Sequence, residues 1–342
     1  MMVDMSRQKL KQRATISAVA DDAGVSRAAV SKVLNNAYGV SDALRQKVEA
    51  SIARLGYRPS VAARGMRGKT FTFGVLLGGI ENPLVSEIVR GISSVAESGG
   101  YKVVMAMGRY KQPLESGMIE SMIDLRLDGV ILIAPRLPDE VLDHFAQQIP
   151  MVVIGHHQPS AGSFDTVNCD DAKGAELAVF ALAKRGYRDI SMLSMPQPDT
   201  NDANIVTMRE IGYKAAMEGL GLNRYTRIIY MPSEQQDRVR TLKKFVSGDE
   251  RPRAIFCWSD LDAIPMIDAV RNAKISVPED LAVIGYDNSS LASLSLFDLT
   301  SVDQLGVEQG KASAHTILSR IAGRVNAEHI VLQPTLILRS SH

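Results

Sequence analysis

Cysteine and long apolar runs are scarce in this chain of 342 residues. The two cysteines, Cys169 and Cys257, stand far apart, so we expect free thiols in a reducing cytosol and no disulfide framework. No apolar run approaches the ~18 residues that a membrane span needs. The N-terminal stretch SRQKLKQR is polar, with no apolar core behind it, so we expect no secretory signal and a disordered basic arm over residues 1–14. These absences favour a cytoplasmic protein with no membrane partner.

Recognisable catalytic motifs are missing as well. The sequence holds no Gly-x-Ser-x-Gly, no His-Glu-x-x-His and no acid pair in a catalytic context. Gly68-Lys69-Thr70 resembles the end of a phosphate loop, but the required earlier glycine is absent and a helix candidate precedes the triplet where a strand should. We therefore predict a protein with no catalytic residues and no cofactor. A sugar-active enzyme using Asp287 as its base is an alternative, for which nothing in the sequence places a partner residue.

Two adjacent histidines, His156 and His157, end an apolar run and raise the question of a metal. Neighbouring side chains on an extended chain point to opposite faces, and no carboxylate cluster accompanies this pair. We therefore predict no metal site.

Charge is distributed unevenly along the chain. Residues 1–69 hold 13 Lys and Arg against 5 Asp and Glu, whereas the remainder holds 26 against 33. A basic head on an acidic body indicates a polyanionic partner for the head alone.

The head reads as three short helices. Apolar side chains recur at i, i+3, i+4 and i+7 from Ile16, Thr15 can cap that helix, and Gly24 ends it. Ser26 can cap a second helix, and a third runs from Ser41 to Gly56. Two helices joined through a glycine turn are typical of a helix-turn-helix, whose second helix enters the major groove of DNA. The alternative is a plain three-helix bundle with solvated charges. The predicted DNA contacts from this head are Thr15, Ser26, Arg27, Ala28, Ser31, Lys32 and Asn35.

The body alternates strand-like and helix-like segments. Three such pairs occupy residues 71 to about 157, and the pattern starts again near Asp170. Repeated βα units predict parallel sheets covered by helices on both faces. We therefore predict an α/β body of two lobes, each with a parallel sheet. Ligands of such sheets gather at the carboxyl ends of the strands, so we expect a binding cleft between the lobes.

The head resembles that of the lactose-repressor/galactose-repressor family of bacterial transcription regulators. The resemblance runs through TISAVADDAGVSRAAVSKVLNN and VSDALRQKVEASIARLGYRPS. Two departures put the operator sequence in doubt. Ala29 stands where the family commonly has Thr, and Lys32 replaces a common Arg, which removes a bidentate fork for guanine.

The resemblance continues through the body. The segments that carry it are ENPLV, LDGVI, REIGY, VPEDL, VIGYD and LTSV, and the LRS near the C-terminus. It implies a periplasmic-binding-protein-like body in which the chain crosses between lobes near residues 170, 301 and 327. We therefore expect a helix-turn-helix domain over 15–59 and a hinge helix over 60–70. The N-terminal lobe would comprise 71–170 plus 302–326, and the C-terminal lobe 171–301 plus 327–339.

The resemblance also implies the effector contacts. In the family, the Arg of Arg-x-x-Gly-Tyr and the Asp of Gly-Tyr-Asp reach the effector, which here gives Arg209 and Asp287; the alternative for each is a salt bridge. Ser259 takes a family Asn position, and its neighbour Trp258 is as readily core as a stacking surface for a sugar. The remaining predicted contacts are Leu84, His156 and Gln304.

The stretch SVAARGMRGK at 60–69 is too short and too rich in glycine to be a stable helix alone. By the resemblance it winds on DNA beside its copy in a second subunit. Arg64 and Arg67 would contact phosphates, and Met66 would be the wedge in the minor groove. The alternative is a simple linker.

These observations predict a sequence-specific DNA-binding regulator. The family resemblance implies that it represses a carbohydrate-utilisation operon. Its partners would be a pseudo-palindromic double-stranded operator, a sugar-like effector and a second copy of the chain. The chain ends three residues after Arg339, without the leucine-heptad tail of the lactose repressor, so we expect a homodimer. Induction by sugar and corepression both fit. The alternative function is a plain sugar-binding protein of the periplasmic type.

Overall fold

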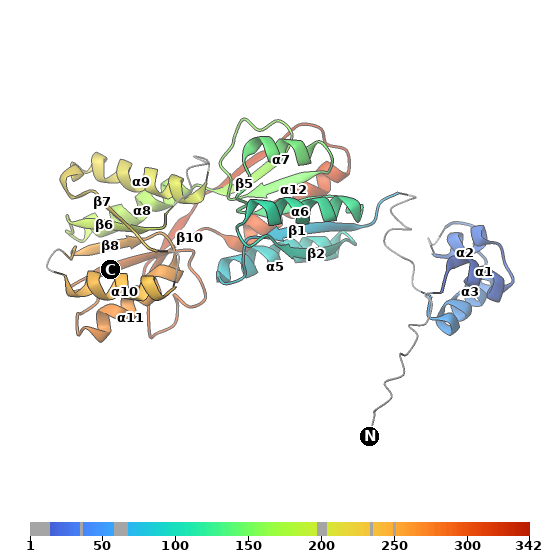
Figure 1. Ribbon diagram of the computed structural model, residues 1–342, viewed down its shortest axis with the longest axis horizontal. Coiled ribbons are helices and arrows are strands. Elements are labelled where there is room, and N and C mark those ends of the chain that lie inside the picture. The colour runs from blue at the N-terminus through green and yellow to red at the C-terminus, as the bar shows by residue number, and fades with distance from the viewer. Residues whose placement is uncertain (1–13, 35–36, 58–67, 197–203, 233–234, 249–250) are drawn as a thin grey trace, which may run out of the picture. The chain divides into compact units, whose positions relative to one another are not determined.

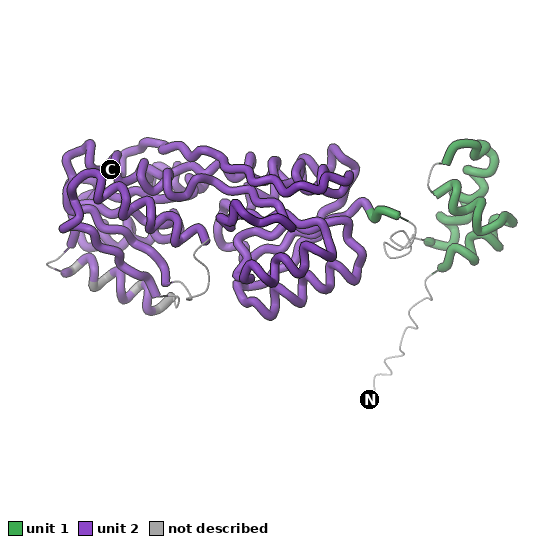
Figure 2. The backbone as a smooth tube through the Cα atoms, turned by 90° about the horizontal axis from the view of Figure 1, so that it is seen from above, with its two compact units in different colours: residues 1–70 green, residues 71–342 purple. Residues whose placement is uncertain are grey.

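The structure, a computed structural model, describes residues 14–34, 37–57, 68–196, 204–232, 235–248 and 251–342. The chain divides into two compact units, residues 1–70 and residues 71–342 (Figure 2). The predicted basic arm lies outside the described residues except for its last position, and so do residues 60–67 of the predicted hinge.

The first unit contains the three predicted helices, α1 (Ile16–Ala23), α2 (Arg27–Leu34) and α3 (Asp42–Leu55). Their caps are those that the sequence predicts: the hydroxyl of Thr15 accepts from the amide of Ala18, and Gly24 ends α1 in the left-handed conformation. Val19, Val30 and Val48, one from each helix, are fully buried and form the centre of a small core.

The first sheet of the second unit is all parallel among its six strands, in the order β11-β5-β4-β3-β1-β2. Its inner strands are fully buried because helices cover both faces, which is why they are nearly continuous apolar runs. The strands are β1 (Thr72–Leu77), β2 (Lys102–Met107), β3 (Val130–Ile133), β4 (Met151–Ile154), β5 (Asp165–Cys169) and β11 (His329–Leu332).

Two pairs of helices cover this sheet (Figure 1). Helices α5 (Pro83–Ser98) and α12 (Gly306–Ile321) pack on one face, and α6 (Gln112–Asp124) and α7 (Asp139–Ala146) on the other. Helix α12 comes from far along the chain, so it ties the end of the sequence to the first lobe.

The second sheet has the order β12-β10-β9-β8-β6-β7, and all its pairings are parallel except that of β10 with β12. Helices α8 (Asp171–Lys184) and α9 (Ile205–Gly219) cover one face, and α10 (Gln235–Ser247) and α11 (Asp260–Asn272) the other. A short 3-10 turn, η1 (Asn223–Tyr225), follows α9. The strands are β6 (Ile190–Ser194), β7 (Arg227–Tyr230), β8 (Ala254–Cys257), β9 (Ala282–Tyr286), β10 (Thr300–Asp303) and β12 (Thr335–Ile337).

The predicted fold class, a small helical head with a body of two parallel-sheet lobes, is thus confirmed. One of the three predicted crossing points is wrong. Strand β10 pairs with β9 through Val302, so the second crossing follows Asp303, close to the predicted position near 301. Strand β11 pairs with β5 in the first sheet, so the third crossing lies after Leu332 rather than near 327. A short edge strand such as β11 gives little sequence signal, which explains the difference at the third crossing.

Candidate functional site between the lobes and on the helical head

Five polar residues from both lobes meet at the carboxyl ends of the strands of the second sheet. We call them the interlobe cluster. Each stands at an element boundary or on a helix: before α5, at the start of α8, on α9, after β9 and after β10. The interlobe cluster consists of Asn82, Asp171, Arg209, Asp287 and Gln304.

Arg209 is the centre of the cluster and is only 1% exposed. Its Nε donates to Oδ1 of Asp171 over 2.8 Å, and its Nη1 donates to the carbonyl of Trp258 over 2.5 Å. The guanidinium lies 3.6 Å from the centre of the Tyr286 ring. Charge pairing, a backbone bond and a ring face therefore fix this side chain before any ligand arrives.

Asp171 links Arg209 to the first lobe. Its Oδ2 is 2.8 Å from Nε2 of His157, which follows β4. Burial raises the pKa of this carboxyl, but the charge of Arg209 and the hydrogen bond with His157 outweigh burial and hold the pKa below its usual value. Asp171 is therefore a buried carboxylate held by two partners.

Asp287 accepts hydrogen bonds on both carboxylate oxygens. Asn82 Nδ2 donates to Oδ2 over 2.9 Å, and Gln304 Nε2 donates to Oδ1 over 2.6 Å. Nη1 of Arg209 lies 3.8 Å from Oδ1. The backbone of Asp287 has a φ of 106°, a conformation that residues other than glycine rarely adopt and that is common at functional sites. Burial, together with the charge of the neighbouring Asp260, raises its pKa to about 7, although the charge of Arg209 acts in the opposite direction.

Asp260 is a second buried carboxyl behind the cluster. It accepts from the Ser289 amide and the Ser301 hydroxyl, each over 2.7 Å. Burial raises its pKa to about 6 despite these bonds. The second lobe therefore holds two carboxyls with raised pKa values, both at the carboxyl ends of its strands.

The structure brings three predicted effector residues, Arg209, Asp287 and Gln304, directly together. Ser259 is fully buried beside the Trp258 carbonyl, and its hydroxyl has no hydrogen-bond partner among the described residues. The Trp258 ring packs partly against the core of the second lobe, and its Nε1 donates to Asp262.

The other two predicted effector residues lie on the first lobe and face protein atoms. His156 is buried, its Nε2 is 2.8 Å from Oδ1 of Asp139, and burial lowers its pKa despite that carboxylate. Leu84 packs at the edge of the core, against the start of α12 at Gly306. In this structure the ring of His156 therefore bonds to Asp139, and Leu84 packs against α12, both within the first lobe.

Sequence reasoning did not assign Asn82, Asp171 and His157 to this site. Asn82 carries a usable signal, because an Asn directly before Pro predicts a helix N-cap, and its Oδ1 indeed accepts from the Leu84 amide. Its second bond, to Asp287, spans 205 positions of sequence and has no local signature.

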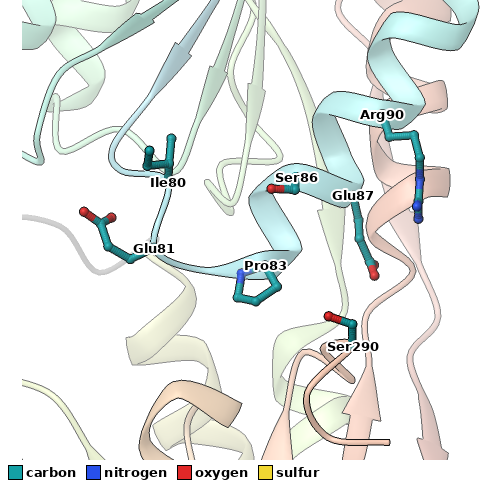
Figure 3. A pocket seen from close by; sticks show the side chains of 7 residues that line it. All are labelled: Ile80, Glu81, Pro83, Ser86, Glu87, Arg90 and Ser290. Carbon is teal, nitrogen blue, oxygen red and sulfur yellow. The ribbon is translucent and has the colours of Figure 1, made fainter. Parts of the chain in front are cut away.

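A hollow of about 370 Å³ opens beside this site at the amino end of α5 (Figure 3). Figure 3 shows Glu81 and Pro83 before and at the start of the helix, with Ser290 of the second lobe opposite Glu87. The predicted effector residues are not among its lining, which consists of Ile80, Glu81, Pro83, Ser86, Glu87, Arg90 and Ser290. It is therefore an outer hollow between the lobes.

On the head, the outer face of α2 presents the predicted DNA contacts. Arg27, Ala28 and Lys32 are exposed, and Ser31 is half-buried. Ser26 and Thr15 are exposed and cap α2 and α1 through their side-chain oxygens, which leaves each hydroxyl proton free of the capping bond. The remaining predicted contacts, Asn35, Arg64, Met66 and Arg67, lie outside the described residues.

Among the described residues no group of three or more His, Cys, Asp or Glu side chains could hold a metal ion. The part of the chain that the structure describes also contains no helix long and apolar enough to cross a membrane.

Comparison with known proteins agrees with this geometry. Residues 15–60 match the bacterial regulatory proteins of the lacI family, and residues 179–342 match the periplasmic binding protein-like domain. The chain is 31% identical over 340 residues to the ribose operon repressor of Escherichia coli (strain K12), covering 96% of this chain and 99% of that protein. The chain belongs to the lacI family of bacterial regulatory proteins.

Solved structures show the same architecture as this lacI-family chain. The complex of the transcriptional regulator CelR with cellobiose is 27% identical, with a TM-score of 0.69, and covers 96% of this chain and 100% of that one. The lac repressor dimer bound to operator and the anti-inducer ONPF is 23% identical, with a TM-score of 0.82, and covers 96% of this chain and 99% of that one. The second likeness supports the fold alone.

Proposed function

We propose that this chain is a DNA-binding transcriptional repressor of a carbohydrate-utilisation operon, controlled by a sugar-like effector held between its lobes. The observation that carries the effector half is Asp287 of the second lobe, whose two carboxylate oxygens accept hydrogen bonds from Asn82 and Gln304 of the first. A carboxylate held this way is suited to accept from two hydroxyl groups of a sugar. The ribose and cellobiose named for two relatives support a sugar as the class of effector.

The DNA-binding half is supported by α2, whose outer face carries Arg27 and Lys32. Ala28 and Ser31 would contact base edges or the thymine methyl group, while Thr15 and Ser26 would donate to phosphates. Asn35, Arg64 and Arg67 would add phosphate contacts, and Met66 would enter the minor groove. We propose a homodimer as the binding species, because two heads match the two halves of a pseudo-palindromic operator.

The proposed domain organisation follows the sheets. The helix-turn-helix domain would occupy 15–59 after a basic arm over 1–14, and the hinge 60–70. The first lobe would comprise 71–170 and 304–332, and the second 171–303 and 333–342, because β10 and β11 belong to the second and first sheets. Three crossings let the lobes move relative to each other with little change inside either sheet.

Regulation would work through competition for Asp287. An effector hydroxyl that takes the place of Asn82 or Gln304 changes the contacts that join the lobes, and so changes the spacing of the two hinges in the dimer. The residues proposed to contact the effector are Leu84, His156, Arg209, Ser259, Asp287 and Gln304. Ser259 is included because a buried hydroxyl without a partner gains a hydrogen bond when a ligand supplies one.

Selection of duplexes by the purified protein tests this function. We expect a pseudo-palindromic consensus, binding that falls steeply with salt, and a change in affinity with one sugar of a panel. Sugar binding without duplex binding by the full-length chain would instead support the plain sugar-binding protein. Catalytic turnover of a sugar would contradict the proposal that this cytoplasmic regulator is not an enzyme.

A further inference from the structure

A second hollow, of about 430 Å³, lies at the amino ends of the strands of the second sheet, whereas the interlobe cluster lies at their carboxyl ends. Arg188 stands two residues before β6, and Arg253 stands directly before β8. The interlobe cluster instead follows the carboxyl ends of the strands, so the two sites are separate. The side chains that line this hollow belong to Arg185, Tyr187, Arg188, Asp189, Tyr225 and Arg253.

This hollow is positively charged, whereas the body around it carries a net negative charge. Residues 70–342 contain fewer Lys and Arg than Asp and Glu, 26 against 33. The hollow nevertheless gathers three arginines against one carboxylate, that of Asp189. A fourth arginine, Arg224, lies beside it with its guanidinium 4.6 Å from the centre of the Tyr225 ring. Like charges repel when they are brought together, so a basic cluster on an acidic body indicates an anionic partner.

Most of the donors in the hollow are unused. The guanidinium groups of Arg185 and Arg188 form no hydrogen bond or ion pair with the residues that the structure describes. Nη2 of Arg253 donates one hydrogen bond to the Glu279 carbonyl over 3.0 Å, and the other N–H groups of this guanidinium remain available to a ligand. The Tyr187 hydroxyl donates to the Pro278 carbonyl, which fixes its ring at the rim.

A helix dipole explains only part of this cluster. Arg185 is the C-terminal cap of α8, where a positive charge is favourable. Arg188 and Arg253 lie on no helix, since each stands between a helix or loop and the strand that follows. Their convergence on one hollow therefore has no explanation in the stability of a neighbouring helix.

We propose that this hollow binds a small molecule that bears a phosphate group, at a site separate from the effector cleft. Arginine forks match phosphate oxygens in pairs, and Arg185, Arg188 and Arg253 supply three forks around one volume. That volume falls within the range of about 300–1,000 Å³ for small-molecule sites. The Tyr187 and Tyr225 rings would contact the apolar part of the molecule. The site would make the chain responsive to a phosphorylated compound in addition to its sugar-like effector.

Calorimetric titration of the full-length protein with pyrophosphate at low salt tests this proposal. We expect saturable binding that weakens about tenfold or more in the double variant Arg188→Gln/Arg253→Gln, because two charge-assisted contacts are lost. The matched control is Arg240→Gln, the same change at an exposed arginine of α10 in the same lobe. Binding to this control should stay within twofold of that to the wild type.

Three outcomes would overturn the proposal. If the wild type does not bind pyrophosphate saturably, the site does not exist. If the double variant binds pyrophosphate as tightly as the wild type, the anion binds elsewhere, such as on the basic head. A tetra-aspartate peptide that binds with the same arginine dependence while pyrophosphate does not would make the hollow a protein-docking site. If circular dichroism shows that the double variant is unfolded, Arg188→Gln alone, at an exposed position, should still weaken binding at least threefold.

Discussion

The side-chain amide of Asn82 donates to Oδ2 of Asp287 over 2.9 Å, and this hydrogen bond joins the start of α5 in the first lobe to the end of β9 in the second. Gln304, where the chain crosses between the lobes, donates to the other oxygen. Two amide groups thus occupy the directions from which two sugar hydroxyls would donate. The carboxylate that we propose for effector binding therefore already joins the lobes, and ligand binding requires an exchange of partners.

Replacing Asn82 by Ser should tighten effector binding. Serine keeps the cap of α5, which accepts from the Leu84 amide, but is too short to reach Asp287. One competing hydrogen bond is worth about 0.5–1.5 kcal/mol, so the Kd of the sugar selected from the panel should fall roughly 2- to 10-fold. Calorimetry measures this change. The control Asn272→Ser removes an exposed amide that donates to Asp268 and should leave Kd unchanged; weaker binding by Asn82→Ser would show that Asn82 itself holds the effector.

The pair of buried carboxyls should make the second lobe less stable as pH rises. The pKa of Asp260 is raised to about 6 and that of Asp287 to about 7, chiefly by burial. In the unfolded chain both groups ionise near pH ~4. Between about pH 4 and pH 7 the folded protein therefore holds more protons than the unfolded one, and the free energy of unfolding falls as pH increases.

The variant Asp260→Asn should reduce this pH dependence. Asparagine can still accept from the Ser289 amide and donate to the Ser301 hydroxyl, and it removes the charge that raises the pKa of Asp287. From pH 5 to pH 8 we expect the wild type to lose about 1–3 kcal/mol more stability than the variant. Urea unfolding followed by fluorescence of Trp258, the single tryptophan, measures the difference. The exposed Asp268→Asn on the same helix is the control, and equal slopes for the wild type and Asp260→Asn would contradict the prediction.

Breaking the pair of Arg209 with Asp171 should be costly. Both side chains are about 1% exposed, so Arg209→Met leaves a buried carboxylate with only His157. We expect a loss of about 3–5 kcal/mol in the free energy of unfolding, measured in urea. Adding Asp171→Asn removes the stranded charge and should restore at least half of that loss. A double variant no more stable than Arg209→Met would show that Arg209 acts through Tyr286 and Trp258 rather than through Asp171.

The resemblance to the lactose-repressor/galactose-repressor family implied Arg209 and Asp287 together, because each belongs to a short motif of that family. It did not predict Asp171 or Asn82 as their partners, since those contacts join segments that are 38 and 205 positions apart. No local pattern records which of several acids a buried arginine will pair with.

The buried inner strands of the fold are predictable from the sequence, whereas the short edge strands are not. The buried strands β3 and β4 are continuous apolar runs, which predict strands directly. Strands β11 and β12 are four and three residues long, only partly buried, and lie at the sheet edges. Such strands carry little apolar periodicity, so the sequence does not mark the third crossing, which follows β11.

Lys32 should contribute to DNA binding through charge. It is exposed on the last turn of α2. If Lys32 contacts a phosphate, Lys32→Gln should weaken binding to all duplexes alike and reduce the slope of log K against log salt by about one. Fluorescence anisotropy over a salt series measures that slope. The control is Arg54→Gln, which removes one charge of the head that is paired with Asp22, and an equal effect of both variants would mean that only net charge matters.

Two helical glycines of the first lobe should respond in opposite ways to alanine. Gly310 of α12 faces α5 so closely that an added Cβ would lie 2.0 Å from the Ile88 carbonyl oxygen. Backbone is on the other side, so the two helices must separate, and we expect Gly310→Ala to lose about 1–3 kcal/mol or more of stability. Gly117 of α6 has no neighbouring atom within 4 Å of an added Cβ.

Gly117→Ala should therefore stabilise the first lobe by about 0.4–1 kcal/mol, because alanine reduces the freedom of the unfolded chain at a position with ordinary helical backbone. Urea unfolding followed by circular dichroism compares the two variants. Because α12 is the segment that leads into β11 and the third crossing, separating it from α5 should also disturb coupling between the lobes. We accordingly expect Gly310→Ala, and not Gly117→Ala, to reduce the effect of the effector on duplex affinity; loss of that effect in both variants, or in neither, would show that the α5–α12 contact has no part in transmission.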